Sequence, residues 1–229
     1  MFTSYEILCM ILKTYTGIFS KAEVHGCFPL PKGPKIIAAN HTLASDSFHL
    51  PLILDETICF LLQDGLFDLP FAGTLLKLAG QIPVQQNHLQ SSDSLTGAHT
   101  ALIEGKTIVI FPEGELVPPG KRIRGRTGAV RLALKTGVPI IPLGMYVPPQ
   151  NTLELGFTRK GCKHSGIWQI SGNCHLNFGA PWKPLMAKAE PTNIHALTNE
   201  LMDSIYKLVS ETQKELTCVS LISPNPILQ

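Results

Sequence analysis

Residues Asn40-His41-Thr42-Leu43-Ala44-Ser45-Asp46 follow an apolar run, Lys35-Ile36-Ile37-Ala38-Ala39, and lead into a helix-like stretch from about Ser45. This order predicts a strand, a turn and a helix. A histidine and an aspartate five residues apart lie about 140° apart around a regular helix, so they could not meet on one helical face. They can meet if His41 lies on the turn and Asp46 in the first helical turn, where the carboxylate would orient the imidazole. Such a pair is a general base with its orienting group.

The same spacing occurs a second time, so it is weak evidence by itself. His88 and Asp93 follow a polar stretch, Gln85-Gln86-Asn87, and no apolar strand leads directly into them. We interpret that copy as a polar loop that runs into a helix. The first copy has support from a second motif, in which the apolar run Ile108-Val109-Ile110-Phe111 ends in Pro112-Glu113-Gly114. We therefore place the candidate base at His41.

Together these motifs resemble the glycerolipid acyltransferase family, of the 1-acylglycerol-3-phosphate or lysophospholipid acyltransferase type. That family is marked by Asn-His-x4-Asp, a Gly-x-Ile block, Phe-Pro-Glu-Gly and a Val-Pro-Ile-x-Pro strand. All four blocks occur here in that order, at Asn40–Asp46, Gly80–Val84, Phe111–Gly114 and Val138–Pro142. The resemblance covers about residues 35–182. Four ordered blocks are a specific signal, whereas any one of them would not be.

The resemblance implies an O-acyltransferase of phospholipid biosynthesis. It would move a fatty acyl group from acyl-CoA or acyl-carrier protein to a hydroxyl of a lysophospholipid such as 1-acylglycerol 3-phosphate. His41 and Asp46 would be catalytic, and Asn40, Glu113 and Gly114 would belong to the acceptor site. Because a thioester is already activated, neutral His41 would only have to accept the hydroxyl proton. No metal ion, and no cofactor beyond the acyl donor, is implied.

The chain departs from the family pattern at positions that would face a phosphate. Gln86 stands where the Gly-x-Ile block usually ends in arginine, and Glu115 follows the Glu-Gly turn. Three arginines just past that turn, Arg122, Arg124 and Arg126, could replace the missing charge, because guanidinium groups suit phosphate. They could equally belong to a basic loop that faces anionic lipid headgroups. The acceptor could therefore be a phosphate-free lipid.

Two other functions stay open. A thioesterase or lipid hydrolase would use the same base to activate water, and a non-catalytic lipid-binding protein of the same fold would need neither His41 nor Asp46. The sequence contains no Gly-x-Ser-x-Gly motif, which disfavours a serine esterase.

The composition suits one globular domain of 229 residues. Hydrophobic residues make up 44% and charged residues 16%, which argues against disorder, and a net charge of +2 is too small to predict nucleic-acid binding. The six cysteines form no Cys-x-x-Cys pair. Cys162, His164, Cys174 and His175 fit no standard zinc spacing, so we predict reduced thiols and no metal site.

Hydrophobic periodicity predicts an α/β fold with a mixed, largely parallel sheet flanked by helices and an amphipathic helix at the N-terminus. Strands are expected at 35–39, 57–63, 81–85, 107–111 and 139–147, and a hairpin at 166–179 around Ser171-Gly172-Asn173. Helices are expected at 2–19, about 45–54, 66–78, 91–104, 127–135 and 194–209. The interval 21–34, rich in glycine and proline, is expected to be a connection.

The apolar stripe of residues 2–19 either packs on the core or lies in a membrane interface, and the acyltransferase resemblance favours lipid contact. No run of 18 uncharged apolar residues predicts a transmembrane helix, and no signal peptide is indicated. We therefore expect a single acyltransferase domain, 1–229, at the cytoplasmic side of a membrane. Residues 1–20 would be its membrane-facing helix and 217–229 a loose tail.

Overall fold

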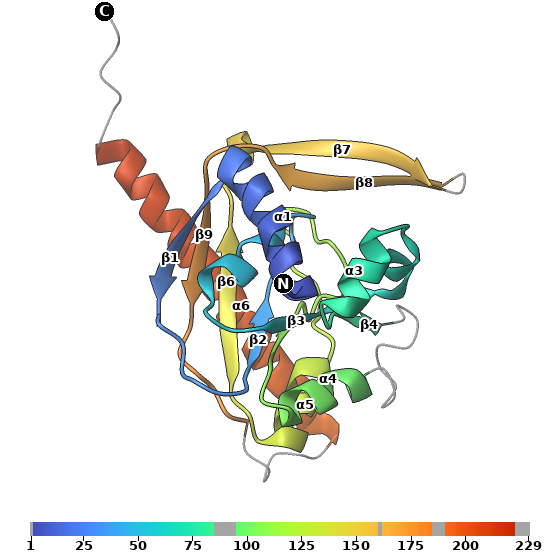
Figure 1. The fold of residues 1–229 in the computed structure, drawn as a ribbon. Coiled ribbons are helices and arrows are strands. Elements are labelled where there is room, and N and C mark those ends of the chain that lie inside the picture. Colours follow the sequence, from blue (N-terminus) through green and yellow to red (C-terminus); the bar gives the residue numbers. More distant parts are fainter. Residues whose placement is uncertain (1, 85–94, 160–161, 185–190, 223–229) are drawn as a thin grey trace, which may run out of the picture.

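The computed structural model describes residues 2–84, 95–159, 162–184 and 191–222 (Figure 1). Its centre is a seven-stranded sheet in the order β1-β9-β6-β2-β5-β3-β4. The strands are β1 (Lys21–Gly26), β2 (Ile36–Ala39), β3 (Ile58–Gln63), β4 (Ile82–Val84), β5 (Thr107–Ile110), β6 (Ile140–Tyr146) and β9 (Asn173–Phe178). Neighbouring strands run parallel except β6 and β9. The predicted mixed, largely parallel sheet is thus confirmed.

Helices cover both faces of this sheet (Figure 1). One face carries α4 (Thr96–Ile103), α5 (Gly128–Thr136) and α6 (Pro191–Ile222), and the other carries α1 (Ser4–Phe19) and α2 (Leu50–Ile53). In β2, Ile36 and Ala38 belong to the core on the α6 side, whereas Ile37 and Ala39 belong to the core on the α2 side. A strand buried on both faces has a continuous apolar sequence, which is why β2 was recognisable.

Helix α1 confirms the predicted N-terminal helix. Thr3 caps it through its side chain, and Glu6 completes a capping box with Thr3. Helix α5 ends at Gly137, which has a φ of 71° and adopts the left-handed conformation that glycine tolerates. Local end signals of this kind are readable from sequence, and both helices lie within a few residues of their predicted bounds.

The expected connection at 21–34 is wrong in its first part, because Lys21–Gly26 form β1. This edge strand pairs in parallel with β9, from Lys21 opposite Asn173 to Gly26 opposite Phe178. Its residues are mostly half-buried, so they lack the continuous apolar run of a central strand. The partner strand is also distant in the chain, and no local turn announces the pairing.

The expected hairpin at 166–179 is also wrong, although a turn does occur there. Strand β8 (Cys162–Gln169) pairs with β7 (Thr152–Arg159) in a separate two-stranded sheet, while β9 pairs with β6 and β1. The β7–β8 pair projects from the body of the protein (Figure 1). The turn therefore passes the chain from one sheet to another, which turn residues alone cannot distinguish from a hairpin.

Two predicted helices are shorter and broken. The one at 66–78 is a 3-10 helix, η2 (Asp64–Asp68), followed by α3 (Ala72–Leu78). Pro70 separates them, since it has no backbone N–H to donate, and Phe71 has a φ of 62°. The one at 45–54 is a 3-10 helix, η1 (Asp46–Phe48), followed by α2.

Some expectations concern residues that lie partly or wholly outside the described part of the chain. Helix α6 runs to Ile222 and so continues into the segment 217–229 that we expected to be a loose tail. Residues 223–229 lie outside the described residues. So do Gln86 and the second His-x4-Asp motif, at His88 and Asp93.

A buried ion pair at the start of β2 should contribute strongly to stability. The Lys35 side chain is 1% exposed and that of Glu56 is 30% exposed, and the Lys35 ammonium donates to both oxygens of Glu56 (2.6 and 2.7 Å) and to Thr107 (3.1 Å). Glu56→Gln leaves this charge buried without its counter-charge, so we expect the free energy of unfolding to fall by about 3 kcal/mol. Urea unfolding monitored by circular dichroism measures it.

The control is Glu104→Gln, which breaks the exposed Lys106–Glu104 pair (2.7 Å; side chains 40% and 53% exposed). This variant should change the free energy of unfolding by less than about 1 kcal/mol. Equal effects of the two substitutions would contradict a stabilising role for the buried pair.

Candidate active site

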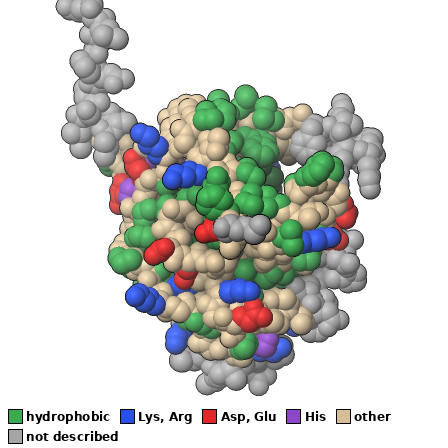
Figure 2. Space-filling view, viewed as in Figure 1, with side chains coloured by type: hydrophobic (Ala, Val, Ile, Leu, Met, Phe, Trp, Pro, Cys, Tyr) green, Lys and Arg blue, Asp and Glu red, His purple; other side chains and the backbone are tan. Residues whose placement is uncertain are grey.

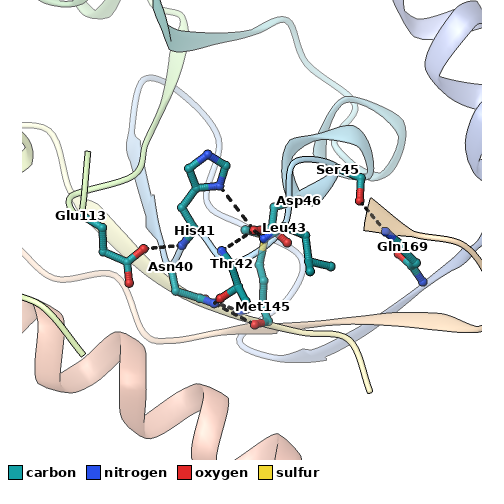
Figure 3. Close-up of polar contacts among 9 residues, drawn as sticks. All are labelled: Asn40, His41, Thr42, Leu43, Ser45, Asp46, Glu113, Met145 and Gln169. Atoms are coloured by element: carbon teal, nitrogen blue, oxygen red, sulfur yellow. Dashed lines mark hydrogen bonds and ion pairs between the residues drawn. The ribbon is translucent and has the colours of Figure 1, made fainter. Parts of the chain in front are cut away.

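His41 and Asp46 meet at the turn that follows β2 (Figure 3). Asp46 Oδ2 lies 3.4 Å from His41 Nδ1. The same oxygen accepts hydrogen bonds from the backbone N–H groups of Thr42 and Leu43, each at 2.7 Å. Asp46 therefore closes the turn as well as facing the imidazole. The structure brings the two residues together as the strand, turn and helix order predicted.

The exposure of the two side chains suits a base and its orienter. The Asp46 side chain is 2% exposed, whereas that of His41 is 23% exposed. If Nδ1–H of His41 points at Asp46, then Nε2 carries the lone pair and can accept a proton. The arrangement can therefore perform general base chemistry at its solvent-accessible side.

Phe111 fixes the plane of the His41 ring. The two ring centroids are 4.1 Å apart and the planes differ by 14°. Phe111 directly follows β5, which runs parallel to β2, so the ends of both strands lie at the same edge of the sheet. This is the edge where open α/β sheets place their ligands.

Glu113 is buried, with 3% of the residue exposed, and both of its carboxylate oxygens are bonded. Oε2 accepts the backbone N–H of His41, and Oε1 accepts the Tyr206 hydroxyl at 2.7 Å. Burial raises the pKa of Glu113, although its two hydrogen bonds oppose this. Burial and the bond to Glu113 raise the pKa of Tyr206 to about 12. Through these two hydrogen bonds the Glu113 side chain links the His41 turn to α6.

Asn40 bonds to β6 through both ends of its amide. Its Nδ2 donates to the Met145 carbonyl (2.9 Å), and its Oδ1 accepts the Met145 N–H (2.7 Å) (Figure 3). The residue is 4% exposed. The side chain therefore continues the β2–β6 pairing beyond the end of β2 and fixes where His41 begins its turn.

The three arginines after the Glu-Gly turn differ in position. Gly114 has a φ of 72°, and a Cβ added there would come within 2.3 Å of Arg126 Nε, so Arg126 lies directly against this turn. The Arg122 guanidinium lies 4.9 Å from the ring centroid of Tyr206, a cation–π contact. Arg124 is exposed. Sequence reasoning named all three and gave no reason to prefer Arg126.

Sequence reasoning also missed the residues that support the turn from other elements. Tyr206 lies on α6, where the sequence shows only an amphipathic pattern. From the β8 side, the Ala44 N–H donates to the Ile167 carbonyl (2.8 Å), and Ser45 Oγ accepts the Gln169 N–H (3.1 Å). No motif or spacing pointed to these contacts, because they join segments far apart in the chain.

Two other features of the described residues lie away from this turn. A surface depression lined by Pro34, Val138 and Lys183 lies at the amino ends of β2 and β6, opposite to the end where His41 lies. The group of side chains that converges closely enough to hold a metal ion is Glu23, His25 and His175, on β1 and β9.

The central strands of the sheet are parallel, and a His–Asp pair and a buried glutamate lie at their carboxyl ends. These features place the protein among α/β proteins that could act as general-base enzymes. The acyltransferase family model matches residues 21–146, more than half of the chain, and the chain belongs to that family. The match contains β2, the His41 turn, Glu113 and β6.

Named relatives agree with this assignment. The chain is 29% identical over 128 residues to a chloroplastic 1-acyl-sn-glycerol-3-phosphate acyltransferase of Brassica napus, covering 55% of this chain and 37% of that protein. It is 33% identical over 132 residues to the 1-acyl-sn-glycerol-3-phosphate acyltransferase of Borreliella burgdorferi, covering 55% and 51%. The chain thus spans about half, or less, of the length of these relatives.

The fold matches a crystal structure of the 1-acyl-sn-glycerophosphate acyltransferase PlsC from Thermotoga maritima. The TM-score is 0.66 at 21% identity, and the match covers 91% of this chain and 79% of that one. At this identity the likeness shows the fold.

The bond between Tyr206 and Glu113 should be measurable as an energetic coupling. In a double-mutant cycle of Tyr206→Phe and Glu113→Gln, we expect a coupling of about 1 kcal/mol in the free energy of unfolding, because Tyr206→Phe removes the donor of this buried bond and Glu113→Gln replaces its charged acceptor with a neutral amide. Urea unfolding of the four proteins gives this quantity.

Tyr5→Phe is the matched control for the cycle. Its hydroxyl bonds to the backbones of Glu56 and Ile58, at 3.4 and 3.2 Å, away from Glu113. Tyr5→Phe and Glu113→Gln should therefore be additive. Additivity of Tyr206→Phe with Glu113→Gln would contradict the role we assign to Tyr206.

Proposed function

We propose that this protein transfers a fatty acyl group from acyl-CoA or acyl-carrier protein to a hydroxyl of a lysophospholipid such as 1-acylglycerol 3-phosphate. The observation that carries the proposal is the His41–Asp46 contact of 3.4 Å at the carboxyl edge of the sheet, next to the buried Glu113. The activity for which these relatives are named supports the choice of acceptor. The family membership supports the reaction class.

In the proposed reaction His41 Nε2 accepts the proton of the acceptor hydroxyl as that oxygen attacks the thioester carbonyl. Asp46 stabilises the imidazolium that forms. The tetrahedral intermediate then breaks its C–S bond, and the leaving thiolate takes the proton back from His41. The products are the ester and the free thiol, and His41 ends neutral. No covalent acyl-enzyme is needed, because the thioester is already activated.

In this proposal Glu113 and Asn40 are positioning residues. Glu113 fixes the backbone of His41, and Asn40 fixes the start of the turn against β6. Gly114 allows Arg126 to lie against the turn. That Asn40, Glu113 and Gly114 also belong to the acceptor site stays a prediction.

We propose that the protein acts as a peripheral membrane enzyme that lies on the lipid through α1. Figure 2 shows hydrophobic side chains gathered on the face that carries α1. Exposed apolar side chains of this helix are Ile7, Met10, Ile11, Ile18 and Phe19. Among the described residues, no helix is both long and apolar enough to span a membrane. Free thiols are found at Cys9, Cys27, Cys59, Cys174 and Cys218, as in reduced proteins of the cytoplasm.

The base is tested by acyl transfer from acyl-CoA or acyl-carrier protein to lysophosphatidic acid. We expect His41→Ala to lower the rate at least about 10²-fold, because general base catalysis contributes that much or more. Asp46→Asn should lower kcat by about 10³–10⁴-fold if the carboxylate controls the tautomer as in hydrolytic triads. Circular dichroism must show that both variants are folded.

Asp93→Asn is the matched control, because it removes the aspartate of the second His-x4-Asp motif. It should leave the rate within a factor of two or so of wild type. A near-normal rate in folded His41→Ala would contradict the mechanism, and a large loss in Asp93→Asn would move the site to the second motif. Acyl release without an acceptor would identify a hydrolase instead.

The arginines of the loop after Glu113 should decide between acceptors. If they bind phosphate, then Arg122→Gln, Arg124→Gln or Arg126→Gln should raise KM for lysophosphatidic acid about tenfold or more, since charge-assisted hydrogen bonds are lost. KM for a phosphate-free lipid acceptor should not change. Lys121→Gln, an equal charge loss at an exposed position of the same loop, is the control. Unchanged KM values in all three variants would leave these arginines without a role in acceptor binding.

A further inference from the structure

Three metal-ligand side chains converge at the β1–β9 edge of the sheet. His175 Nδ1 lies 3.1 Å from Glu23 Oε2 and 3.2 Å from His25 Nε2, and His25 Nε2 lies 4.0 Å from the same Glu23 oxygen. This group lies apart from the proposed acyl-transfer residues, because β9 is two strands away from β2 in the sheet.

The strand pairing explains why these residues meet. Glu23 lies opposite His175 in the parallel β1–β9 register, and His25 lies two residues further along β1 on the same face. The alternate residues Ala22, Val24, Cys174 and Leu176 belong to the core on the α2 side. The three ligand side chains therefore point to the opposite face, which α6 covers and where Asn177 bonds to Thr212.

His175 Nδ1 has two close polar neighbours, so its contacts admit more than one arrangement of protons. A neutral imidazole has one N–H, and His175 Nδ1 faces both a carboxylate oxygen and a ring nitrogen at hydrogen-bonding distance. A proton on His175 Nδ1 can point at Glu23 or at His25, but not straight at both. If Nδ1 instead accepts from His25, its lone pair faces the carboxylate at 3.1 Å. The same three atoms, in their unprotonated forms, can instead converge on one metal ion, because each then offers a lone pair.

The neighbouring residues and the solvent exposure of Glu23, His25 and His175 suit metal binding. Asn173 Nδ2 donates to Glu23 Oε1, which leaves Oε2 directed at the histidines. Outer contacts of this kind orient metal ligands. The His175 side chain is 5% exposed, so its contacts with Glu23 and His25 are shielded from solvent. The His25 and Glu23 side chains are 32% and 45% exposed, so an ion can enter from solvent.

We propose that Glu23, His25 and His175 bind one divalent transition-metal ion of the zinc type, with the remaining position open to water. Zinc binds imidazole nitrogen and carboxylate oxygen at about 2.0–2.2 Å in tetrahedral geometry, which places two ligand atoms about 3.3 Å apart. Two of the three separations, 3.1 and 3.2 Å, are close to that value. The third, 4.0 Å, is longer, so binding would require a shift of the half-exposed Glu23 or His25 side chain. Our expectation from sequence of no metal site is revised accordingly.

The consequence of binding would be structural. The ion would join the edge strand β1 to β9, and β1 begins directly after α1. It would therefore fix the N-terminal helix to the sheet. This inference does not depend on the proposed acyl-transfer reaction.

The test uses the full chain without a histidine tag, stripped with EDTA, dialysed and titrated with Zn²⁺ in a calorimeter. We expect one ion per chain, and a rise in Tm on adding Zn²⁺. Glu23→Gln and His25→Gln, at half-exposed positions, should each weaken binding at least tenfold and abolish the rise in Tm. His175→Gln should do the same, provided that circular dichroism shows a native fold.

Two control variants separate this site from other ligands. His195→Gln removes an exposed histidine of α6, and Cys27→Ser removes an exposed thiol just beyond β1. Both should bind Zn²⁺ as wild type does. Titration with Co²⁺ adds a geometric readout, since tetrahedral Co²⁺ has intense visible absorption that His25→Gln should lose.

The proposal is overturned if wild-type protein binds no Zn²⁺. It is also overturned if Glu23→Gln and His25→Gln bind Zn²⁺ as tightly as wild type, or if binding is lost in Cys27→Ser or His195→Gln.

Discussion

The carboxylate of Glu113 is the interaction on which the candidate site depends. It lies on the turn after β5, accepts the backbone N–H of His41 after β2, and accepts the hydroxyl of Tyr206 on α6. A buried carboxylate is costly unless its oxygens are bonded, so the three segments must come together for the fold to be stable. One side chain thus couples the position of the candidate base to the packing of the longest helix.

Helix α6 consequently belongs to the site, although its sequence shows only an apolar stripe. Leu197, Leu201 and Ile205 are buried in the core on its side of the sheet. Gly125, in the loop after Glu113, lies so close to Met202 that an added Cβ would come within 2.6 Å of its Cγ. The packing of this helix therefore determines the position of the loop after Glu113 and the position of Tyr206. The geometry around His41 is therefore a product of long-range packing, not only of the local turn.

The same distinction explains what could be predicted from the sequence. Strands β2, β5 and β6 are buried on both faces, so each appears as an apolar run, and the His41 turn is closed locally by Asp46. Strand β1 is a half-buried edge strand, and its His25 meets a histidine 150 residues away. Because the sequence of that segment predicts a connection, it gives no sign of the cluster of Glu23, His25 and His175. The sequence gives no sign of the role of Tyr206 either, because Tyr206 is far along the chain from Glu113.

A chain of buried polar contacts links α1 to the candidate base. Ser20, directly after α1, lies 3.1 Å from His49 Nε2, and His49 Nε2 lies 3.3 Å from Gln169 Oε1. The backbone N–H of Gln169 donates to Ser45, the neighbour of Asp46. Burial lowers the pKa of His49, which keeps this link uncharged. If α1 lies in the lipid interface as proposed, these contacts join the residue that follows it to the turn that carries His41 and Asp46.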